Sequence, residues 1–228
     1  MKKNYFLLSL LVFFFHAALA QKFNAGFSLG LCATDISGAD TRDGDSDFHK
    51  IGFTAGGLIN TPINKKNVFQ FEINFIQKGS SQPPDSNNNG YYKIALAYVE
   101  VPLLVKRHVT FTLKKKPVNK VDLEAGASIG RMISRTVVGN TNYNIATPDK
   151  LFNRTDISIL LGADYNFTKN VYFCLRYSNS IIPAIKRTAP NINFITYTFN
   201  RGNNMVFQFS FKFVFSTSKS SDDDSDQK

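Results

Sequence analysis

The stretch Met205–Phe215, MVFQFSFKFVF, places a phenylalanine at every odd position from 207 onward. Gln208, Ser210 and Lys212 lie between these rings. Successive side chains of a β-strand point to opposite faces, so the pattern predicts a strand with one aromatic face and one polar face. A membrane-spanning barrel turns such an aromatic face to lipid and keeps the polar face inside. The stretch therefore predicts the closing strand of a transmembrane β-barrel.

The same alternation recurs in seven earlier segments. Lipid offers no partner for an unpaired strand edge, so a closing strand requires other strands that complete a barrel. Apolar residues occupy every second position in segments 23–31, 51–55, 69–75, 99–105, 121–129, 157–165 and 171–177. Together with the closing strand they predict eight strands, each near the length of about 9–11 residues that a tilted transmembrane strand requires.

The fourth of these segments is irregular. Leu96 and Tyr98 fall on even positions, whereas Val99 and the apolar residues after it fall on odd positions. A β-bulge at this point would switch the parity. Pro102 cannot donate a ladder hydrogen bond, so pairing is expected to be weak around it. The odd alternation continues to Leu113, which predicts a strand that projects beyond the membrane before it turns.

The connections between the expected strands alternate in length. Long polar connections are expected at 34–50, 79–91, 134–155 and 183–202, and shorter ones at 60–67, 108–120 and 167–170. Outer-membrane barrels have long outer loops and short periplasmic turns, and an even strand number returns both ends of the chain to the periplasm. The predicted fold is therefore all-β: an eight-stranded antiparallel up-and-down transmembrane barrel with long outer loops and shorter periplasmic turns.

The beginning of the chain predicts export. Lysines at positions 2 and 3 precede an apolar run, and the small-residue sequence Ala18–Ala20 follows it. This order is typical of a secretory signal peptide that is removed before Gln21. The expected organisation in a Gram-negative cell is a signal peptide at 1–20, an outer-membrane barrel at 21–215 and an acidic periplasmic tail at 216–228.

Charged residues at inward positions predict a polar network in the barrel lumen. These residues are Glu72, Glu100, Asp122, Glu124, Asp164, Arg176 and Lys212. Eight strands enclose an interior only wide enough for side chains to fill. A packed network of ion pairs is therefore expected, with a water-filled pore as the alternative. Buried charges without partners are costly, so these groups are expected to pair with one another.

The net charge of +10 points to anionic partners. For an exported chain the expected counterpart is outer-membrane lipid and lipopolysaccharide phosphate, not nucleic acid. The later outer loops carry cations that either contact lipopolysaccharide or are ordinary exposed loop charges: Arg135, Lys150, Arg154, Lys186, Arg187 and Arg201. Envelope or secretion proteins are further candidate partners, and a monomer is expected.

The expected first outer loop alternates carboxylates at Asp43, Asp45 and Asp47. Oxygen ligands of this kind bind calcium, so the loop is either a cation site or a solvated acidic loop. A full calcium-binding loop adds a glycine after the third acidic position and a distal glutamate. Phe48 and His49 follow here instead, so no metal site is assigned.

Two cysteines in an oxidising compartment suggest a disulfide. Cys32 and Cys174 both face inward by parity, but they are expected on strands separated by another strand and at different heights. Bridged Cα atoms must lie within about 7 Å. Both cysteines are therefore predicted to be free.

Enzymatic outer-membrane barrels use serine and histidine at the outer rim. Beyond the expected signal peptide the histidines are His49 and His108, which are predicted at opposite ends of the barrel. The spacing assigns no Ser–His–acid constellation. Neither an enzymatic activity nor a cofactor is expected.

Sequence pieces follow one another in the order AGFSLGL, FHKIGFTAG, FEINFIQKGS, AYVEVPLLVK, EAGASIG and LGADYNF, of which YVEVPLLVK is the most distinctive. In this order residues 23–215 resemble the PorT-like outer membrane β-barrel family of Bacteroidota. The resemblance implies an eight-stranded barrel of porin-family type and no settled activity, although founding members belong to the type IX secretion system. The expected function is a non-enzymatic structural or interaction role in the cell envelope. The alternatives are a component of type IX secretion and a small channel.

Overall fold

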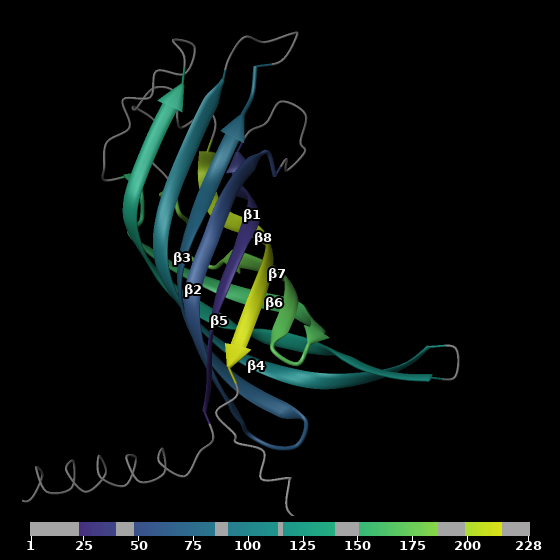
Figure 1. Ribbon diagram of the computed structural model, residues 1–228. Helices are drawn as coiled ribbons and strands as arrows, with labels where there is room; N and C mark the ends of the chain where they lie inside the picture. The colour runs from purple at the N-terminus through teal and green to yellow at the C-terminus, as the bar shows by residue number, and fades with distance from the viewer. Residues whose placement is uncertain are drawn as a thin grey trace, which may run out of the picture.

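Eight antiparallel strands close into a barrel in the computed structural model (Figure 1). The strands are β1 (Asn24–Ala39), β2 (Lys50–Pro62), β3 (Asn67–Gln82), β4 (Tyr92–Leu113), β5 (Lys116–Gly139), β6 (Thr155–Thr168), β7 (Val171–Ser180) and β8 (Phe199–Phe215). Each strand pairs with its neighbours in sequence, and β1 pairs with β8 to close the ring. The predicted eight-stranded up-and-down barrel is confirmed.

The structure describes residues 23–39, 48–84, 91–113, 116–139, 151–186 and 199–215. The expected signal peptide at 1–20 and the expected acidic tail at 216–228 lie outside these residues. Among the described residues, no helix has the length and apolar character needed to cross a membrane.

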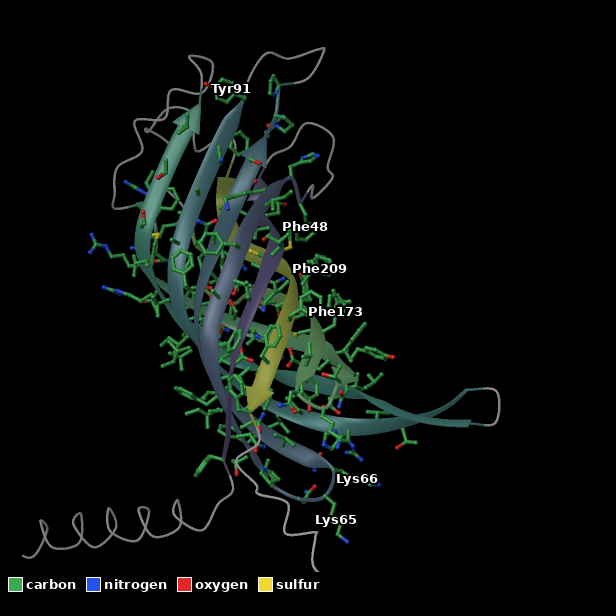
Figure 2. The ribbon with its side chains drawn as sticks, viewed as in Figure 1. Phe48, Lys65, Lys66, Tyr91, Phe173 and Phe209 are labelled. Atoms are coloured by element: carbon green, nitrogen blue, oxygen red, sulfur yellow. The ribbon has the colours of Figure 1, made fainter. Side chains whose placement is uncertain are left out.

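The alternation in sequence becomes the two faces of the barrel wall. On β8, Phe209 and Phe211 are 45% and 49% exposed on the outside, whereas Ser210 and Lys212 are each 1% exposed in the interior. Figure 2 shows Phe209 and, on the neighbouring strand, Phe173 pointing away from the barrel. An exposed aromatic wall around a buried polar interior is the arrangement of a barrel surrounded by lipid.

The irregularity in β4 lies where the parity change predicts it. The register of β4 against β5 shifts between Ala97 and Tyr98, which confirms the expected bulge. On its other side, pairing of β4 with β3 stops at Leu103 and resumes at Glu100. Pro102, which has no N–H to donate, lies in this gap. The weak pairing expected around the proline is therefore present.

Strands run further than the sequence predicts. They extend into the connections expected from residues 34, 79, 134 and 183, since β1 continues to Ala39, β3 to Gln82 and β5 to Gly139, and β8 begins at Phe199. The predicted boundaries followed the apolar alternation, which stops where a lipid-facing wall is no longer required. Backbone hydrogen bonding between strands does not require apolar side chains, so pairing continues beyond that point.

The β4–β5 hairpin extends past its neighbours. The connection expected at 108–120 is mostly paired strand, because β4 reaches Leu113 and β5 begins at Lys116. β3 pairs with β4 as far as Arg107, and β6 pairs with β5 as far as Val121. Beyond these residues the hairpin projects sideways from the barrel (Figure 1). The fourth strand thus projects beyond its neighbouring strands, and its projection beyond the membrane stays a prediction.

The first strand begins and the last strand finishes at the same end of the barrel, where Ala25 of β1 pairs with Phe215 of β8. The short β2–β3 and β6–β7 connections and the projecting hairpin lie at the same end (Figure 1). We call this the terminus end. The opposite end, from which the longer connections leave, is the loop end.

Candidate functional site in the barrel lumen

Arg176 of β7 lies at the centre of the charges in the lumen. Its Nη1 and Nη2 donate to the carboxylate of Glu72 on β3 at 2.9 and 2.8 Å. Its Nε donates to Oε1 of Glu124 on β5 at 2.6 Å. A guanidinium presents planar, fixed donors, which suits it to hold two carboxylates at once. One side chain thereby connects three strands across the interior.

Lys212 of β8 is the second cation of this group. Its Nζ lies 2.8 Å from Oε2 of Glu124, 2.9 Å from Oδ1 of Asp164 and 3.8 Å from Oε1 of Glu72. Lys106 of β4 lies 2.5 Å from Oδ2 of Asp164. Three carboxylates thus meet three cations, and the charges balance. We call these residues the central cluster: Glu72, Lys106, Glu124, Asp164, Arg176 and Lys212.

A second cluster lies nearer the loop end. Nζ of Lys78 on β3 forms ion pairs with Glu100 and Asp156, and its distance to Oδ2 of Asp156 is 2.7 Å. It also lies 5.5 Å from the ring centroid of Tyr98. The hydroxyl of Ser180 donates a further hydrogen bond to Asp156. This cluster joins β3, β4, β6 and β7.

The structure separates the seven predicted lumen residues into three groups. Five of them belong to the central cluster, and Glu100 belongs to the second cluster. Asp122, close to the terminus end, pairs with the ring of His108. All seven side chains are buried, and each has an oppositely charged or ionisable partner.

Three further charged residues take part that the sequence interpretation did not name. These are Lys78 and Asp156 in the second cluster and Lys106 in the central cluster. Each occupies an even position on a strand whose even side chains face inward. Parity would therefore have identified them, but Lys78 and Asp156 lie at the borders of connections, 79–91 and 134–155, that were expected to be loops.

An apolar plug lies at the loop end of the lumen. Phe152 bridges to Ile185, which in turn bridges to Gly202 near the start of β8. The side chains of Leu151, Phe152, Ala184 and Ile185 are buried and pack against apolar residues of the barrel wall. These four residues form the apolar plug. They come from connections expected as outer loops, so parts of those connections fold into the barrel.

The predicted lipopolysaccharide-contacting cations have different surroundings. Cζ of Arg135 lies 4.7 Å from the ring centroid of Phe152, so this side chain packs on the apolar plug. Arg154 and Lys186 are exposed at the loop end. Of Arg201 only the backbone is described. Outside the described residues lie Lys150, Arg187, Asp43, Asp45 and Asp47.

Both cysteines are free and buried, as predicted. Cys32 pairs with Gln208 on one side of β8, and Cys174 pairs with Ser210 on the other side. The two cysteines are therefore offset by two residues along β8, on opposite sides of that strand. The intervening strand keeps them apart, because two strand spacings amount to about 10 Å.

Glu124, Asp164 and Cys174 bring three potential metal-ligand atoms within 4.8 Å of one another. Nζ of Lys212 lies 2.8 Å from Glu124 and 2.9 Å from Asp164. Its ammonium group therefore compensates the two carboxylates that would otherwise attract a metal ion. Glu124 and Asp164 belong to the central cluster, and Sγ of Cys174 donates to Oε1 of Glu124 at 3.4 Å, so the three residues are part of the ion-pair network and not a separate metal centre.

The two histidines of the described chain lie far apart. His49 is exposed beside Lys50, whose backbone pairs with Thr34 at the loop end. His108 is exposed at the terminus end, beyond the last β3–β4 pair. The expectation that they occupy opposite ends of the barrel is confirmed.

A family model described as an outer membrane protein beta-barrel domain matches residues 19–186. Among solved structures, the chain is similar to Ail, the attachment invasion locus protein of Yersinia pestis. The two sequences are 11% identical, the match covers 85% of this chain and 99% of that chain, and the TM-score is 0.45. It is also similar to Neisserial surface protein A, with 13% sequence identity and a TM-score of 0.42. That match covers 84% of this chain and 96% of the other chain. No curated protein matches the chain. Identities this low say nothing about a shared function.

Proposed function

Because the chain belongs to the outer membrane protein beta-barrel domain family, we propose that it is a sealed barrel with a non-enzymatic structural or interaction role in the cell envelope. The observation that carries this proposal is the contact of Arg176 with Glu72 and Glu124 across the lumen. A side chain bonded to three strands of a narrow barrel obstructs the path of an ion. The role then belongs to the outer surfaces of the barrel, not to its interior.

The apolar plug supports the same proposal from the loop end. Phe152 and Ile185 pack above the charged clusters, where a hydrated ion would lose its water without gaining polar partners. A charged layer and an apolar layer therefore lie in series along the lumen. A small channel, the alternative function, would need both layers to open.

Conductance in planar lipid bilayers tests this proposal. The full chain is expected to insert without producing stepwise currents, because the central cluster and the apolar plug obstruct the lumen. The double variant Arg176→Ala/Lys212→Ala removes the two cations that span the interior and is expected to leak ions. Migration on an unheated gel checks that each protein has folded as a barrel. Stepwise currents from the unmodified chain would identify a channel instead.

The proposal includes an orientation, with the terminus end in the periplasm and the loop end outside the cell. An even strand number and an export signal, expected at residues 1–20, support it. Protease added to intact cells is expected to cut within the long connections and to spare the β4–β5 hairpin. Cleavage of the hairpin in intact cells would reverse the orientation.

A component of type IX secretion is the second candidate, through the resemblance of YVEVPLLVK (Tyr98–Lys106) to the PorT-like family. The even residues of this motif face the lumen, and among them Tyr98, Glu100, Leu104 and Lys106 are buried. Packing inside the barrel thus accounts for the motif without reference to secretion. Affinity purification of the tagged chain from envelopes separates the two candidates, since a secretion component should co-purify with its machinery. A deletion strain tested for envelope integrity and for secretion of exported enzymes gives the second readout.

Lipopolysaccharide is the partner we propose for the loop end. Arg154 and Lys186 are exposed there, and guanidinium and ammonium groups suit phosphate. The double variant Arg154→Gln/Lys186→Gln is expected to retain less lipopolysaccharide during purification. Lys65→Gln/Lys66→Gln, at the opposite end, is the matched control.

A further inference from the structure

Exposed charges at the terminus end have one sign wherever the structure describes them. Lys65 and Lys66 are exposed in the β2–β3 connection, and Lys169 is exposed in the β6–β7 connection. Arg107 is exposed on β4, where pairing with β3 ends. The acidic side chains described near this end are buried: Asp122, Glu124 and Asp164. Positive charge therefore dominates this surface.

The projecting hairpin adds to this positive charge. Residues 107–121 contain no acidic residue, and the part of β5 that belongs to the hairpin includes Lys116 and Lys120. The hairpin runs sideways from the barrel wall (Figure 1), and Lys65 and Lys66 lie on the turn below it (Figure 2). We call the six cations the cationic rim: Lys65, Lys66, Arg107, Lys116, Lys120 and Lys169.

Exposed aromatic side chains lie next to the rim on the side of the membrane. Phe167, which is 66% exposed, precedes Lys169 by two residues, and Phe69 follows Lys66 by three. Phe215, at the end of β8, is exposed at the same level of the barrel. Aromatic rings concentrate where hydrocarbon meets the headgroups. Two residues of strand span about 7 Å, so the cations lie one step further out than the rings, where lipid phosphates are expected in a bilayer.

From this order of apolar wall, aromatic rings and cations, we propose that the cationic rim binds the headgroups of anionic phospholipids. The inference rests on the proposed function, which gives the terminus end the periplasmic leaflet as its surroundings. Ammonium and guanidinium groups form charge-assisted hydrogen bonds with phosphate oxygens. The sideways course of the hairpin carries the backbone of residues 116–120 along the bilayer surface instead of away from it. The rim would thus anchor the barrel at a defined depth and collect anionic lipid around it.

Electron paramagnetic resonance of spin-labelled lipids tests the proposal with the full chain in phosphatidylcholine vesicles. Spin-labelled phosphatidylglycerol is expected to associate with the barrel about fivefold more strongly than spin-labelled phosphatidylcholine, which corresponds to about 1 kcal/mol for a cation near an anionic lipid. The preference is expected to fall between low salt and about 1 M salt, where the screening length drops to about 3 Å.

Two sets of substitutions make the test specific to the rim. The quadruple variant Lys65→Gln/Lys66→Gln/Arg107→Gln/Lys169→Gln is expected to lose most of the preference, and adding Lys116→Gln/Lys120→Gln is expected to remove the rest. The matched control replaces two exposed cations away from the rim, Lys93 on β4 and Arg131 on β5, and is compared with the rim double variant Lys65→Gln/Lys66→Gln. That control is expected to retain the larger part of the preference.

The outcomes separate the rim from its alternatives. Equal association of both spin-labelled lipids with the unmodified chain would overturn the proposal. A preference for phosphatidylglycerol that survives all six rim substitutions would also overturn it. The rim would then be assigned to an acidic protein partner. Gel migration of unheated samples scores insertion separately. A chain that does not insert into vesicles at all contradicts the proposed function, not the lipid preference of the rim.

Discussion

Glu72 and Arg176 form a two-point ion pair in the middle of the barrel, with N–O distances of 2.8 and 2.9 Å. Their strands, β3 and β7, are four apart in a ring of eight, so the two residues reach toward each other from opposite walls. They are 104 residues apart in sequence. The pair therefore forms only when the barrel has closed.

Arg176→Met is expected to destabilise the barrel by about 3–5 kcal/mol, because it leaves the buried carboxylates of Glu72 and Glu124 with fewer partners. Urea titration of the protein folded into lipid vesicles measures the loss. Arg176→Lys keeps the charge but not the planar set of donors, and a smaller loss is expected. Arg107→Met, at an exposed position, serves as a control and should change stability by about 0.5 kcal/mol or less. A wild-type midpoint for Arg176→Met would show that the central cluster does not stabilise the fold.

Lys212→Gln is expected to lower the stability of the folded barrel by about 3–5 kcal/mol. This loss is at least as large as that expected for an arginine on the lipid-facing side of β8. Nζ of Lys212 contacts both Glu124 and Asp164, so its loss leaves two buried carboxylates undercompensated. Adding Asp164→Asn to Lys212→Gln removes one of these charges and should recover part of the stability. A double-mutant cycle in the same urea titration measures this coupling. Strictly additive losses would contradict a direct interaction.

Phe211→Arg is expected to destabilise the barrel by about 2–4 kcal/mol if this position lies near the midplane of the bilayer. The side chain of Phe211 is exposed on the outer face between Leu29 and Phe173. Phe211→Leu keeps an apolar side chain and is the control. Tolerance of Phe211→Arg together with stabilisation by Ser210→Leu would mean that the polar face meets lipid.

Gly79→Ala is expected to destabilise the barrel by about 1–3 kcal/mol or more, since Gly79 has a φ of 131° that other residues avoid. An added Cβ would also lie 1.9 Å from the carbonyl oxygen of Ile94 on β4. Gly57→Ala is the matched control, because the nearest atom to its added Cβ is 3.9 Å away. Similar urea midpoints for the two variants would contradict the backbone conformation at Gly79.

Cys32 and Cys174 are expected to resist alkylation in the folded barrel, because both side chains are buried. After unfolding without reductant, mass spectrometry should detect two alkylated cysteines. A protein that gains only one label or none under these conditions would contain an oxidised thiol or a bridge. A bridge between Cys32 and Cys174, seen as the loss of both labels together with two hydrogens, would contradict the strand order around β8.

The ends of the strands were less predictable than their middles. The apolar alternation identifies the part of β1 up to Leu31, but the strand continues to Ala39. The same holds at the β4–β5 hairpin, where pairing proceeds beyond Arg107 although no third strand is present. Backbone pairing depends on the neighbouring strand being in reach, and that is a property of the assembled sheet.

The alternation in sequence was sufficient to determine the number of strands, the lipid-facing aromatic face of β8 and the bulge before Val99. It also determined which residues face inward, because a period of two is a local property of an extended chain. Which inward charges meet was decided by the tertiary structure alone. Arg176 selects Glu72 from the opposite wall, and Phe152 enters the lumen from a connection expected to be outside it. These contacts depend on the register between strands and on closure of the ring, which bring together residues that the linear pattern leaves unrelated.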